Sequence, residues 1–513
     1  MSQTAAATAG AHAKQLLLIN PTITSRRSAR FPLSLLALAG FLEEGYRCRI
    51  IDGNVDRIYL TAIRRALAED RFTAVGMTVM GGPQVQSAIA ASLTVREASR
   101  QTPIIWGGYF PTLYARAALD APYVDYVVRG RGEATLAQLL GRLDSGSSES
   151  LGAIEGLGWK RDGEVVCNAE RRFEALRAPS LLPYHLLGDP RAYLARTFLG
   201  QRTAAHEAAL GCRFRCTFCG VAAMFRGATS LPTAARLERD LLWLRDGLGA
   251  DSIQYFDHNF FDREADMVPL LEVLARVQLP WWCYARADAL LNLSAASWTL
   301  VRKSGLRMAY IGAESPDDTL LKQIRKGTRA DQTLAVADLC RRQGVIPELS
   351  FMVAPPHDPE GETERTFEFI RQIKRVNPHS EIIIYIYTPP PAESLPEGSV
   401  ARRTATLLRD RHGDPVRFPR TPEEWTERRW VDYACHADAP WLTERLRRRI
   451  RDFVTVLGCR FPTVQDVRSG PVMKSALSAL ASWRYRYRRY ERPWELALSK
   501  RLLRLADPHV TGI

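Results

Sequence analysis

The sequence predicts an α/β protein in which a doubly wound parallel sheet precedes a partial parallel barrel and a mostly helical C-terminal region. Two observations predict this fold. Short β-branched runs alternate with helical patterns in two separate series, and most of these runs end at Gly, Asp, Asn or another turn residue. The 513 residues, of which 46% are hydrophobic and 25% charged, have an average globular composition and are enough for about three domains.

The first series covers residues 14–145 and predicts the doubly wound sheet. Its first strand, KQLLLIN (14–20), stops at Asn20-Pro21, and the helical pattern FPLSLLALAGFLEEG follows. Further strands are expected at RCRIIDGN, AVGMTV, PIIWGG and YVDYVVRG. Such sheets bind ligands beyond the carboxyl ends of their strands. The polar and glycine segments at these ends are Asp52-Gly53-Asn54, Gly107-Gly108 and Gly130-Arg131-Gly132-Glu133.

Residues 146–194 change character and are expected to form a linker. DSGSSES (144–150) is a polar loop, and GLGWKRDGEVVCN predicts a β-hairpin that turns at Asp162-Gly163. A proline-containing stretch follows.

The second series covers residues 195–398 and predicts the barrel. After a cysteine-rich loop come the runs DSIQYFDHNF, WWCYARAD, RMAYIGAES, IPELSFMVAPP and EIIIYIYTPPP. Six or so such units suffice for a complete or partial barrel with its functional loops at one end. Residues 399–513 form the basic, mostly helical C-terminal region.

The cysteine-rich loop GCRFRCTFCG (211–220) carries the strongest chemical signal. Its cysteines are spaced C-x3-C-x2-C, and three thiolates can bind three irons of a cubane cluster while the fourth iron stays open to another ligand. Nine cysteines, an odd number, favour metal binding over a disulfide framework. A structural zinc or an ordinary cluster needs a fourth nearby ligand, and His206 and His258 are not at zinc-finger spacing.

This loop, with Phe218 just before the third cysteine and Gly220 after it, resembles the signature of the radical S-adenosylmethionine (SAM) superfamily. The resemblance implies that Cys212, Cys216 and Cys219 hold a 4Fe-4S cluster whose open iron is chelated by SAM. An electron from the cluster would cleave SAM to methionine and a 5′-deoxyadenosyl radical. The residues that the resemblance and the strand ends assign to SAM are Phe218, Gly220, Asp257, Arg286, Glu314 and Ser350. Each of the strand-end residues alone is equally well explained as a cap or turn residue.

The N-terminal half resembles the cobalamin-binding domain of B12-dependent radical SAM enzymes. The matching segments are LINP, PLSLLALAGFLEEGYRCRIIDGN, AVGMTV, IIWGGYFPT and VDYVVRGRGEATLAQLL, so the resemblance covers about residues 15–400. It implies a Rossmann-like cobalamin domain followed by a (β/α)6-type partial TIM barrel. A dinucleotide fold is disfavoured because Asn20-Pro21-Thr22 stands where G-x-G-x-x-G would follow the first strand. The implied cobalamin contacts are Asn20, Asp52, Asn54, Thr78, Gly107, Gly108, Gly130, Gly132 and Glu133.

The loop after the first strand, NPTITSRRSARF, lacks the D-x-H-x-x-G pattern that supplies a histidine below cobalt. The resemblance therefore implies cobalamin without its tail base and without a histidine ligand, as in the methylating subgroup. A weakly ligated lower face favours release of a methyl group as a radical. One departure from the family is the loop FMVAPPHDPEGET, which is longer than the compact glycine-proline turn often found there.

The combination predicts a radical SAM C-methyltransferase that acts on an unactivated carbon of a small-molecule or lipid-like metabolite. The deoxyadenosyl radical would abstract a hydrogen atom, and the carbon radical would take the methyl group of methylcobalamin. After the electron donor has reduced the cobalt, a second SAM would remethylate it. The alternative is a non-methylating enzyme of oxidative cyclisation or ring rearrangement, because the layout also resembles anaerobic porphyrin cyclases and hopanoid methylases. No protein acid or base is assigned; Tyr284, Cys283 and His258 are expected to pack or bind.

The C-terminal region is strongly basic. Residues 401–513 hold 24 Lys and Arg against 13 Asp and Glu, which is +11 of the net charge of +14. ERLRRRIRDFV (444–454) and WRYRYRRYERPWELALSKRLLRL (483–505) interleave Arg with aromatic residues. A helical cap whose Arg stems cover the barrel is favoured over contact with a membrane or lipid substrate. RNA binding is disfavoured further because no RNA-binding motif occurs.

The expected environment and partners follow from these features. No run of 18 apolar residues occurs and MSQTAAATAGAHAK is unlike a secretory signal, so a cytoplasmic enzyme is expected, with peripheral membrane association as an alternative. Reduction of the cluster calls for an electron donor such as flavodoxin or ferredoxin.

Overall fold

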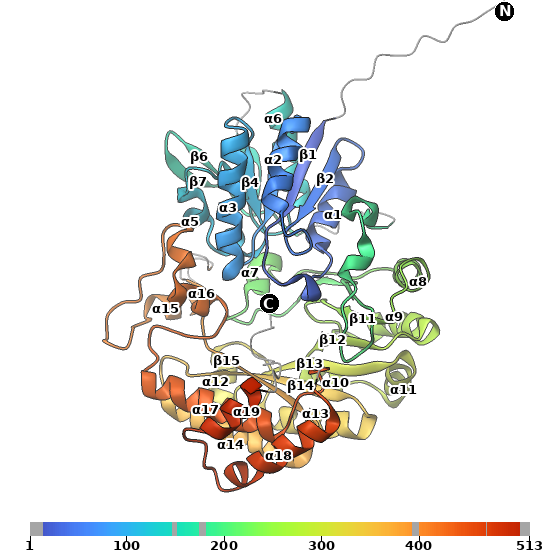
Figure 1. Cartoon of the computed structure of the whole chain (residues 1–513), viewed down its shortest axis with the longest axis vertical. Helices are drawn as coiled ribbons and strands as arrows, with labels where there is room; N and C mark the ends of the chain where they lie inside the picture. The colour runs from blue at the N-terminus through green and yellow to red at the C-terminus, as the bar shows by residue number, and fades with distance from the viewer. Residues whose placement is uncertain are drawn as a thin grey trace, which may run out of the picture. The chain divides into compact units, whose positions relative to one another are not determined.

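The computed structural model describes residues 14–145, 151–173, 181–391, 395, 400–467 and 469–502 (Figure 1). These residues form two compact units, described separately below. The N-terminal unit holds the residues up to Arg26, then Pro32–Pro190 and Arg420–Glu424; the barrel unit holds Arg27–Phe31, Arg191–Pro419 and the residues from Trp425 onward. Most of the N-terminal segment that is unlike a secretory signal (1–13), most of the predicted polar loop (146–150) and the end of the basic tail (503–505) lie outside the described residues.

The N-terminal unit is built on a parallel sheet with the strand order β2-β1-β3-β4-β5. Its first strand is a short apolar run that is buried on both faces, as parallel strands covered by helices are. The doubly wound sheet predicted from the alternating runs is confirmed. The strands are β1 (Gln15–Asn20), β2 (Arg47–Asp52), β3 (Ala74–Thr78), β4 (Ile104–Gly107) and β5 (Tyr126–Val128).

Helices cover both faces of this sheet. On one face, α1 and α6 enclose a core with strand residues such as Leu16 and Ile105. On the other face, Ser92 of α3 accepts the indole N–H of Trp106 at 3.0 Å and contacts the sulfur of Met77. The helices are α1 (Leu33–Leu42), α2 (Tyr59–Glu69), α3 (Pro83–Ala98), α4 (Tyr109–Leu113), α5 (Ala115–Asp120) and α6 (Glu133–Ser145).

The predicted hairpin forms, and it belongs to the sheet of the N-terminal unit. Strands β6 (Leu157–Arg161) and β7 (Glu164–Cys167) pair with each other, and β6 pairs antiparallel with β5, which extends the sheet to seven strands. The bounds of the linker predicted over residues 146–194 stay a prediction, but the hairpin within them is part of the sheet. The physical reason is that β5 would otherwise expose a row of unpaired backbone groups at the sheet edge. The other domain boundaries stay predictions.

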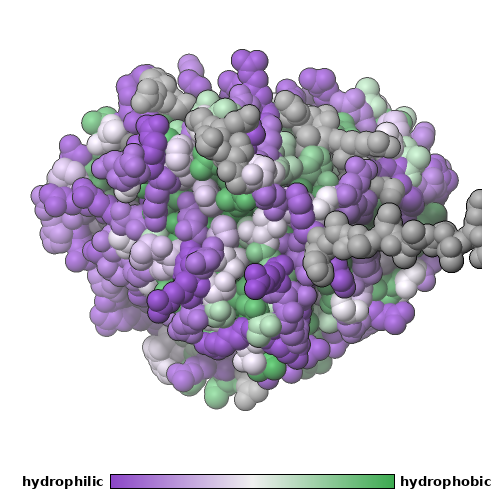
Figure 2. Space-filling model, turned by 90° about the horizontal axis from the view of Figure 1, so that it is seen from above, coloured by the Kyte–Doolittle hydropathy of each residue, from purple (hydrophilic) through white to green (hydrophobic). Residues whose placement is uncertain are grey.

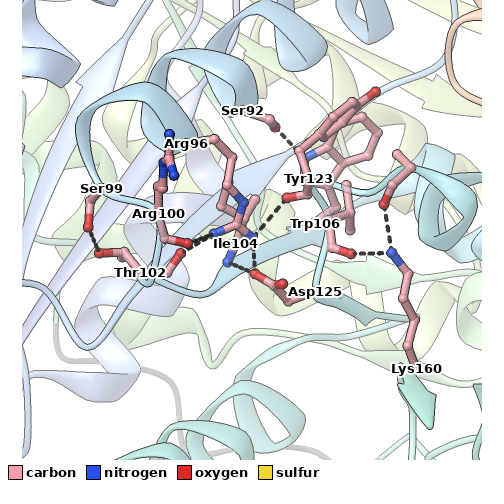
Figure 3. A network of polar contacts seen from close by, with 12 residues as sticks. Ser92, Arg96, Ser99, Arg100, Thr102, Ile104, Trp106, Tyr123, Asp125 and Lys160 are labelled. Carbon is pink, nitrogen blue, oxygen red and sulfur yellow. Dashed lines mark hydrogen bonds and ion pairs between the residues drawn. The ribbon is translucent and has the colours of Figure 1, made fainter. Parts of the chain in front are cut away.

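A network of polar contacts fixes this edge (Figure 3). The ammonium of Lys160 on β6 donates to the carbonyls of Ala121 at 2.7 Å and Val124 at 3.0 Å, just before β5. The carboxylate of Asp125 accepts the backbone N–H of Ile104 at 2.7 Å and pairs with Arg96 of α3. The network ties the hairpin, β4, β5 and α3 together, so that the hairpin is a firm part of the sheet.

The barrel unit contains six parallel strands in the order β15-β14-β13-β12-β11-β8. The ladder does not close between β8 and β15, which confirms a partial barrel. The strands are β8 (Thr203–His206), β11 (Ser252–Tyr255), β12 (Trp281–Ala285), β13 (Leu306–Glu314), β14 (Ile346–Val353) and β15 (Glu381–Ile386). The helices that accompany them are α8 (Ala234–Leu242), α9 (Glu264–Val277), α10 (Ala287–Leu291), α11 (Ala295–Ser304), α12 (Asp318–Gln323), α13 (Ala330–Gln343) and α14 (Pro359–Val376).

The C-terminal region is mostly helical where it is described, and its helix α17 packs on α14 of the barrel. The rings of Phe453 on α17 and Phe367 on α14 stack with centroids 3.7 Å apart, and Arg449 donates to Glu364 at 2.7 Å. Contacts of this kind favour the helical cap among the alternatives for the tail. The helices are α15 (Val400–Thr406), α16 (Arg428–Ala434), α17 (Glu444–Arg460), α18 (Pro471–Arg486) and α19 (Trp494–Leu502).

The outer surface is mixed in character. Figure 2 shows one face on which hydrophilic side chains predominate and hydrophobic ones are scattered among them. On α18 and α19, Trp483 and Trp494 are exposed. In the part of the chain that the structure describes, every helix is too short or too polar to cross a membrane. Peripheral membrane contact stays a prediction.

Candidate active site

The cysteine loop begins at a short two-stranded ladder between β9 (Leu210–Gly211) and β10 (Thr229–Ser230) and ends in α7 (Gly220–Phe225). The turn after β11 holds the backbone that leads into it. The carboxylate of Asp257 accepts the N–H groups of Ala208 at 2.6 Å and Ala209 at 2.9 Å, and Gly211 donates to Nδ1 of His258 at 3.3 Å. Asp257 is fully buried, and burial raises its pKa to about 7 against these hydrogen bonds. Asp257 therefore orders the loop; its assignment to SAM stays a prediction.

The three predicted cluster ligands lie close enough together to interact electrostatically. Burial raises the pKa of each thiol, and the charge of Cys216 adds to the increase at Cys212 and Cys219. Two cations, Lys326 and Arg286, oppose the increase at Cys216. Backbone N–H groups do the same at Cys212 and Cys219. Nearby cations and N–H donors stabilise thiolates, the form that binds iron.

The donor set fits a cubane cluster. Among the described residues, no three His, Cys, Asp or Glu side chains converge as the ligands of one metal ion do. Each thiolate of a cubane binds its own iron, so the three sulfurs of this loop need not converge on one point. Cys212, Cys216 and Cys219 would hold the cluster.

Glu314 is the best-defined of the predicted SAM residues. It ends β13 in the left-handed region, with φ 64°, after an irregularity in the pairing with β14. Its carboxylate accepts a hydrogen bond from Lys326 at 2.7 Å, and both side chains are buried. A Cβ on Gly312 would lie 2.1 Å from the Glu314 carboxylate and 2.5 Å from the Lys326 ammonium. Gly312 therefore leaves the space in which this ion pair forms.

Arg286 lies against the cysteine loop rather than free at the barrel mouth. Its guanidinium makes two 3.0 Å contacts with Asp288, donates to the carbonyl of Lys326 at 2.8 Å and lies 3.6 Å from the ring centroid of Phe214. The ring of Phe218 lies 6.0 Å from the Lys326 ammonium. The structure thus brings Arg286, Phe218 and Glu314 together around Lys326.

Two further buried residues of the barrel are relevant to SAM binding. Ser350 is buried on β14, close enough to Tyr310 to lower the pKa of that phenol against the larger effect of burial. Asn259, two residues after Asp257, is 7% exposed, and both its Nδ2 and Oδ1 are buried without a partner among the described residues. Buried amides normally have hydrogen-bond partners. A polar group of a bound cofactor would satisfy Asn259, which the residue assignment from the sequence did not include.

In the N-terminal unit, the predicted cobalamin residues occupy the carboxyl edge of the sheet. Asp52 and Asn54 are buried; Asn54 donates to Asp52 and accepts the N–H groups of Ile23 at 2.8 Å and Thr24 at 3.0 Å. These two side chains therefore shape the loop after β1. Asn20 accepts a hydrogen bond from Gln84 at 3.1 Å.

The remaining predicted cobalamin residues lie at the ends of β3, β4 and β5. A Cβ on Gly108, with φ 98°, would lie 3.0 Å from the Thr78 hydroxyl, which explains the glycine. The N–H of Gly130 donates to Thr112 at 2.9 Å, and the buried Glu133 accepts from Arg131 at 2.9 Å. Gly107 ends β4, and Gly132 follows in the loop before α6. Contact of any of these residues with cobalamin stays a prediction.

Comparison with known proteins identifies both units. Residues 20–140 match the family model of the B12 binding domain, and residues 207–370 match that of the radical SAM superfamily. The chain is a B12-binding radical SAM protein. The resemblance described above is confirmed, and the cofactors of this B12-binding radical SAM protein are cobalamin, a 4Fe-4S cluster and SAM.

Relatives of this B12-binding radical SAM protein fall into two kinds of enzyme. An uncharacterized methyltransferase of Pyrococcus horikoshii is 23% identical over 376 residues, which is 70% of this chain and 78% of the relative. The anaerobic magnesium-protoporphyrin IX monomethyl ester cyclase of Synechocystis is 24% identical over 379 residues, 71% of this chain and 72% of the relative. The chain is therefore a cobalamin-dependent radical SAM enzyme with both methyltransferase and cyclase homologues.

A solved structure shares the fold of this B12-binding radical SAM protein. The radical SAM methyltransferase TsrM of Kitasatospora setae, with cobalamin and a 4Fe-4S cluster bound, has a TM-score of 0.61 at 16% identity. The match covers 96% of this chain and 99% of TsrM. The similarity extends through both units.

Gly211 offers a test of how tightly the cysteine loop is built. Its φ is 79°, and a Cβ there would lie 2.2 Å from the backbone oxygen of Ala228. We expect Gly211→Ala to lower iron content and to slow formation of 5′-deoxyadenosine about a hundredfold, because the clash displaces the cluster ligands. Iron assay and mass spectrometry measure both effects.

The matched control is Gly163→Ala. Gly163 has nearly the same φ, 83°, but no atom lies within 4 Å of a Cβ there. This variant should carry only the backbone strain, about 1–2 kcal/mol, and keep its iron. Equal iron contents in the two variants would contradict the proposed clash.

The buried carboxyl group of Glu348 leads to a prediction of how folding stability depends on pH. Its carboxylate is buried on β14 and accepts hydrogen bonds from Trp282 at 2.9 Å and Gln465 at 2.5 Å. Burial raises its pKa from 4.5 to about 7. The folded state then binds more protons than the unfolded state between these values, so the contribution of Glu348 to stability falls as pH rises from 4.5 to about 7.

Relative to the wild type, we expect the free energy of unfolding of Glu348→Gln to rise by about 2–3 kcal/mol between pH 5 and pH 8. Thermal unfolding at the two pH values measures the change. The control Glu272→Gln, at an exposed position of α9, should show no such change. If the difference in stability between Glu348→Gln and the wild type did not change with pH, the Glu348 carboxyl would be solvated in the folded protein.

Proposed function

We propose that this protein is a C-methyltransferase that places a methyl group on an unactivated carbon of a small-molecule or lipid-like metabolite. The observation that carries the proposal is the loop after β1. Residues 20–31 contain no histidine, and Asn54 holds the loop by accepting the N–H groups of Ile23 and Thr24. A lower face of cobalt without an imidazole ligand favours release of a methyl group as a radical. The relative that is named a methyltransferase supports methyl transfer as the reaction class.

The cofactors supply the reactive chemistry: the cluster with SAM generates the radical, and cobalamin carries the methyl group. The chain's own residues bind and orient them. Cys212, Cys216 and Cys219 would ligate the cluster, and Lys326 holds the carboxylate of Glu314 in place beside the cysteine loop. Orientation of this kind, with exclusion of water, is the contribution that a protein makes to cofactor chemistry.

The proposal is tested with protein reconstituted anaerobically with cobalamin, SAM carrying a deuterated methyl group and a strong reductant. Mass spectrometry quantifies 5′-deoxyadenosine and S-adenosylhomocysteine. We expect both products, and we expect S-adenosylhomocysteine to depend on cobalamin. Replacement of the reductant by reduced flavodoxin or ferredoxin tests the electron donor that we propose.

The second candidate function is oxidative cyclisation or ring rearrangement, which the cyclase relative supports at similar identity. In that case the same assay yields 5′-deoxyadenosine without cobalamin-dependent S-adenosylhomocysteine. The absence of both products from cluster-loaded protein would contradict both candidates.

A further inference from the structure

Arg30 belongs to the short segment Arg27–Phe31, which is part of the barrel unit. Its guanidinium lies 4.3 Å from the ring centroid of Phe256, the residue between β11 and Asp257. The next residue, Phe31, stacks on Tyr193 with centroids 5.3 Å apart, which fixes the segment against the unit. Arg30 is therefore held at the end of the second barrel strand.

Phe256 is the first ring of an aromatic wall, which we define as Phe256, Trp282, Tyr284, Tyr310 and Tyr385. Phe256 and Trp282 have centroids 5.7 Å apart, Trp282 and Tyr284 4.7 Å, and Tyr284 and Tyr310 5.0 Å. Tyr310 in turn lies close enough to Tyr385 for the two phenols to interact electrostatically. All of these rings except Trp282 are only half-buried. The wall thus runs across β11–β15 with ring surface still available for contact.

The wall connects Arg30 to the predicted SAM residues. Tyr310 interacts electrostatically with Glu314, and Arg30 interacts electrostatically with Tyr284. A molecule lying along the wall would therefore reach from the SAM residues at one end to the guanidinium at the other.

The charge of Arg30 is not balanced within the described residues. The recorded contacts of its guanidinium are the face of Phe256 and the electrostatic interaction with Tyr284, and neither is a carboxylate. Two acids that interact with the rings of the wall have other partners: Glu314 pairs with Lys326, and Glu348 accepts hydrogen bonds from Trp282 and Gln465.

The surroundings of Arg30 are crowded although its side chain is exposed. Protein atoms surround it closely enough for burial to lower its pKa, yet more than a third of its surface remains accessible. A guanidinium has five N–H donors in a planar fork that suits a carboxylate or phosphate. The accessible part of the Arg30 side chain leaves room for such an anion to reach it.

We propose that Arg30 binds an anionic group, a carboxylate or a phosphate, of a substrate whose flat or apolar body lies along the aromatic wall. This inference rests on the proposed function in that the substrate is the methyl acceptor. It narrows the acceptor to an organic acid or phosphate ester and makes Arg30 a residue that determines specificity.

The test measures binding alone, by ligand-observed NMR and calorimetry on the cofactor-loaded full chain. The probes are indole-3-acetate and phenyl phosphate, each compared with a neutral counterpart, indole-3-acetamide and phenol. We expect the wild type to prefer each anion, Arg30→Gln to lose at least about tenfold of that preference, and Arg30→Lys to keep part of it. The control Arg27→Gln, an exposed residue of the same segment, should keep the preference.

Two results would overturn the proposal. One is equal binding of anionic and neutral probes by the wild type. The other is an unchanged preference for anions in Arg30→Gln. If that variant also lost its cobalamin absorbance, the role of Arg30 would be to hold the cofactor. Charge-selective binding that depends on Arg30, in a protein that forms no S-adenosylhomocysteine, would uphold the anion site and reject methyl transfer.

Discussion

Cys216→Ala is expected to abolish formation of 5′-deoxyadenosine while leaving cobalamin bound. Cys216 is buried in the cysteine loop, where its charge acts on both of the other thiols. With two thiolates left, the cubane loses a ligand that no other side chain of the loop can replace. Iron and sulfide assays, the absorbance of cobalamin and product mass spectrometry measure the three effects on one preparation.

The control for this variant is Cys435→Ala. Cys435 is also in the barrel unit and half-buried, but it lies outside the cysteine loop, so cluster and activity should be retained. Joint loss of cluster and cobalamin in Cys216→Ala would argue against two separate cofactor sites.

Lys326→Met is expected to lower the free energy of unfolding by about 3–5 kcal/mol. The substitution removes the partner of Glu314, whose carboxylate is buried and accepts the Lys326 hydrogen bond at 2.7 Å. An unpaired buried carboxylate carries a desolvation cost that the ion pair otherwise offsets. The midpoint of thermal unfolding of the barrel unit should fall by several degrees, as measured by calorimetry.

Two variants make this result specific. Lys322→Met, at an exposed position of α12, should be within about 0.5 kcal/mol of the wild type. The double variant Glu314→Gln with Lys326→Met should recover much of the lost stability, because it leaves no buried charge. A loss below about 1 kcal/mol in Lys326→Met alone would show that water reaches the pair in solution.

The fold followed from local patterns to a large extent. The barrel strands end where the turn and polar residues predicted, so that Asp257, Arg286 and Glu314 close successive strands. The hairpin at Asp162-Gly163 was also visible, because turn residues and alternation act over a few neighbouring residues. Its place in the sheet was not, since pairing with β5 depends on which edge is left uncovered in the folded unit.

The site shows the same division. The spacing of Cys212, Cys216 and Cys219 is a property of the chain itself, so the sequence alone was enough to predict the cluster ligands. No pattern indicates that Lys326 pairs with Glu314 across the bare backbone of Gly312. Asn259 was seen only as part of a strand-end turn, and its missing hydrogen-bond partners become apparent once burial is known.

The sequence by itself determined the cluster ligands and the order of the two α/β units, because ligand spacing and hydrophobic periodicity are covalent and local properties, and its resemblance to a known family implied cobalamin and SAM. Only the tertiary structure decided which charges are balanced. It placed Lys326 on Glu314, and Arg30 on the face of Phe256, which lies 226 positions further along the chain. Contacts over such separations depend on how strands and loops pack, and the free energy of a charge depends on the burial and partners that packing gives it.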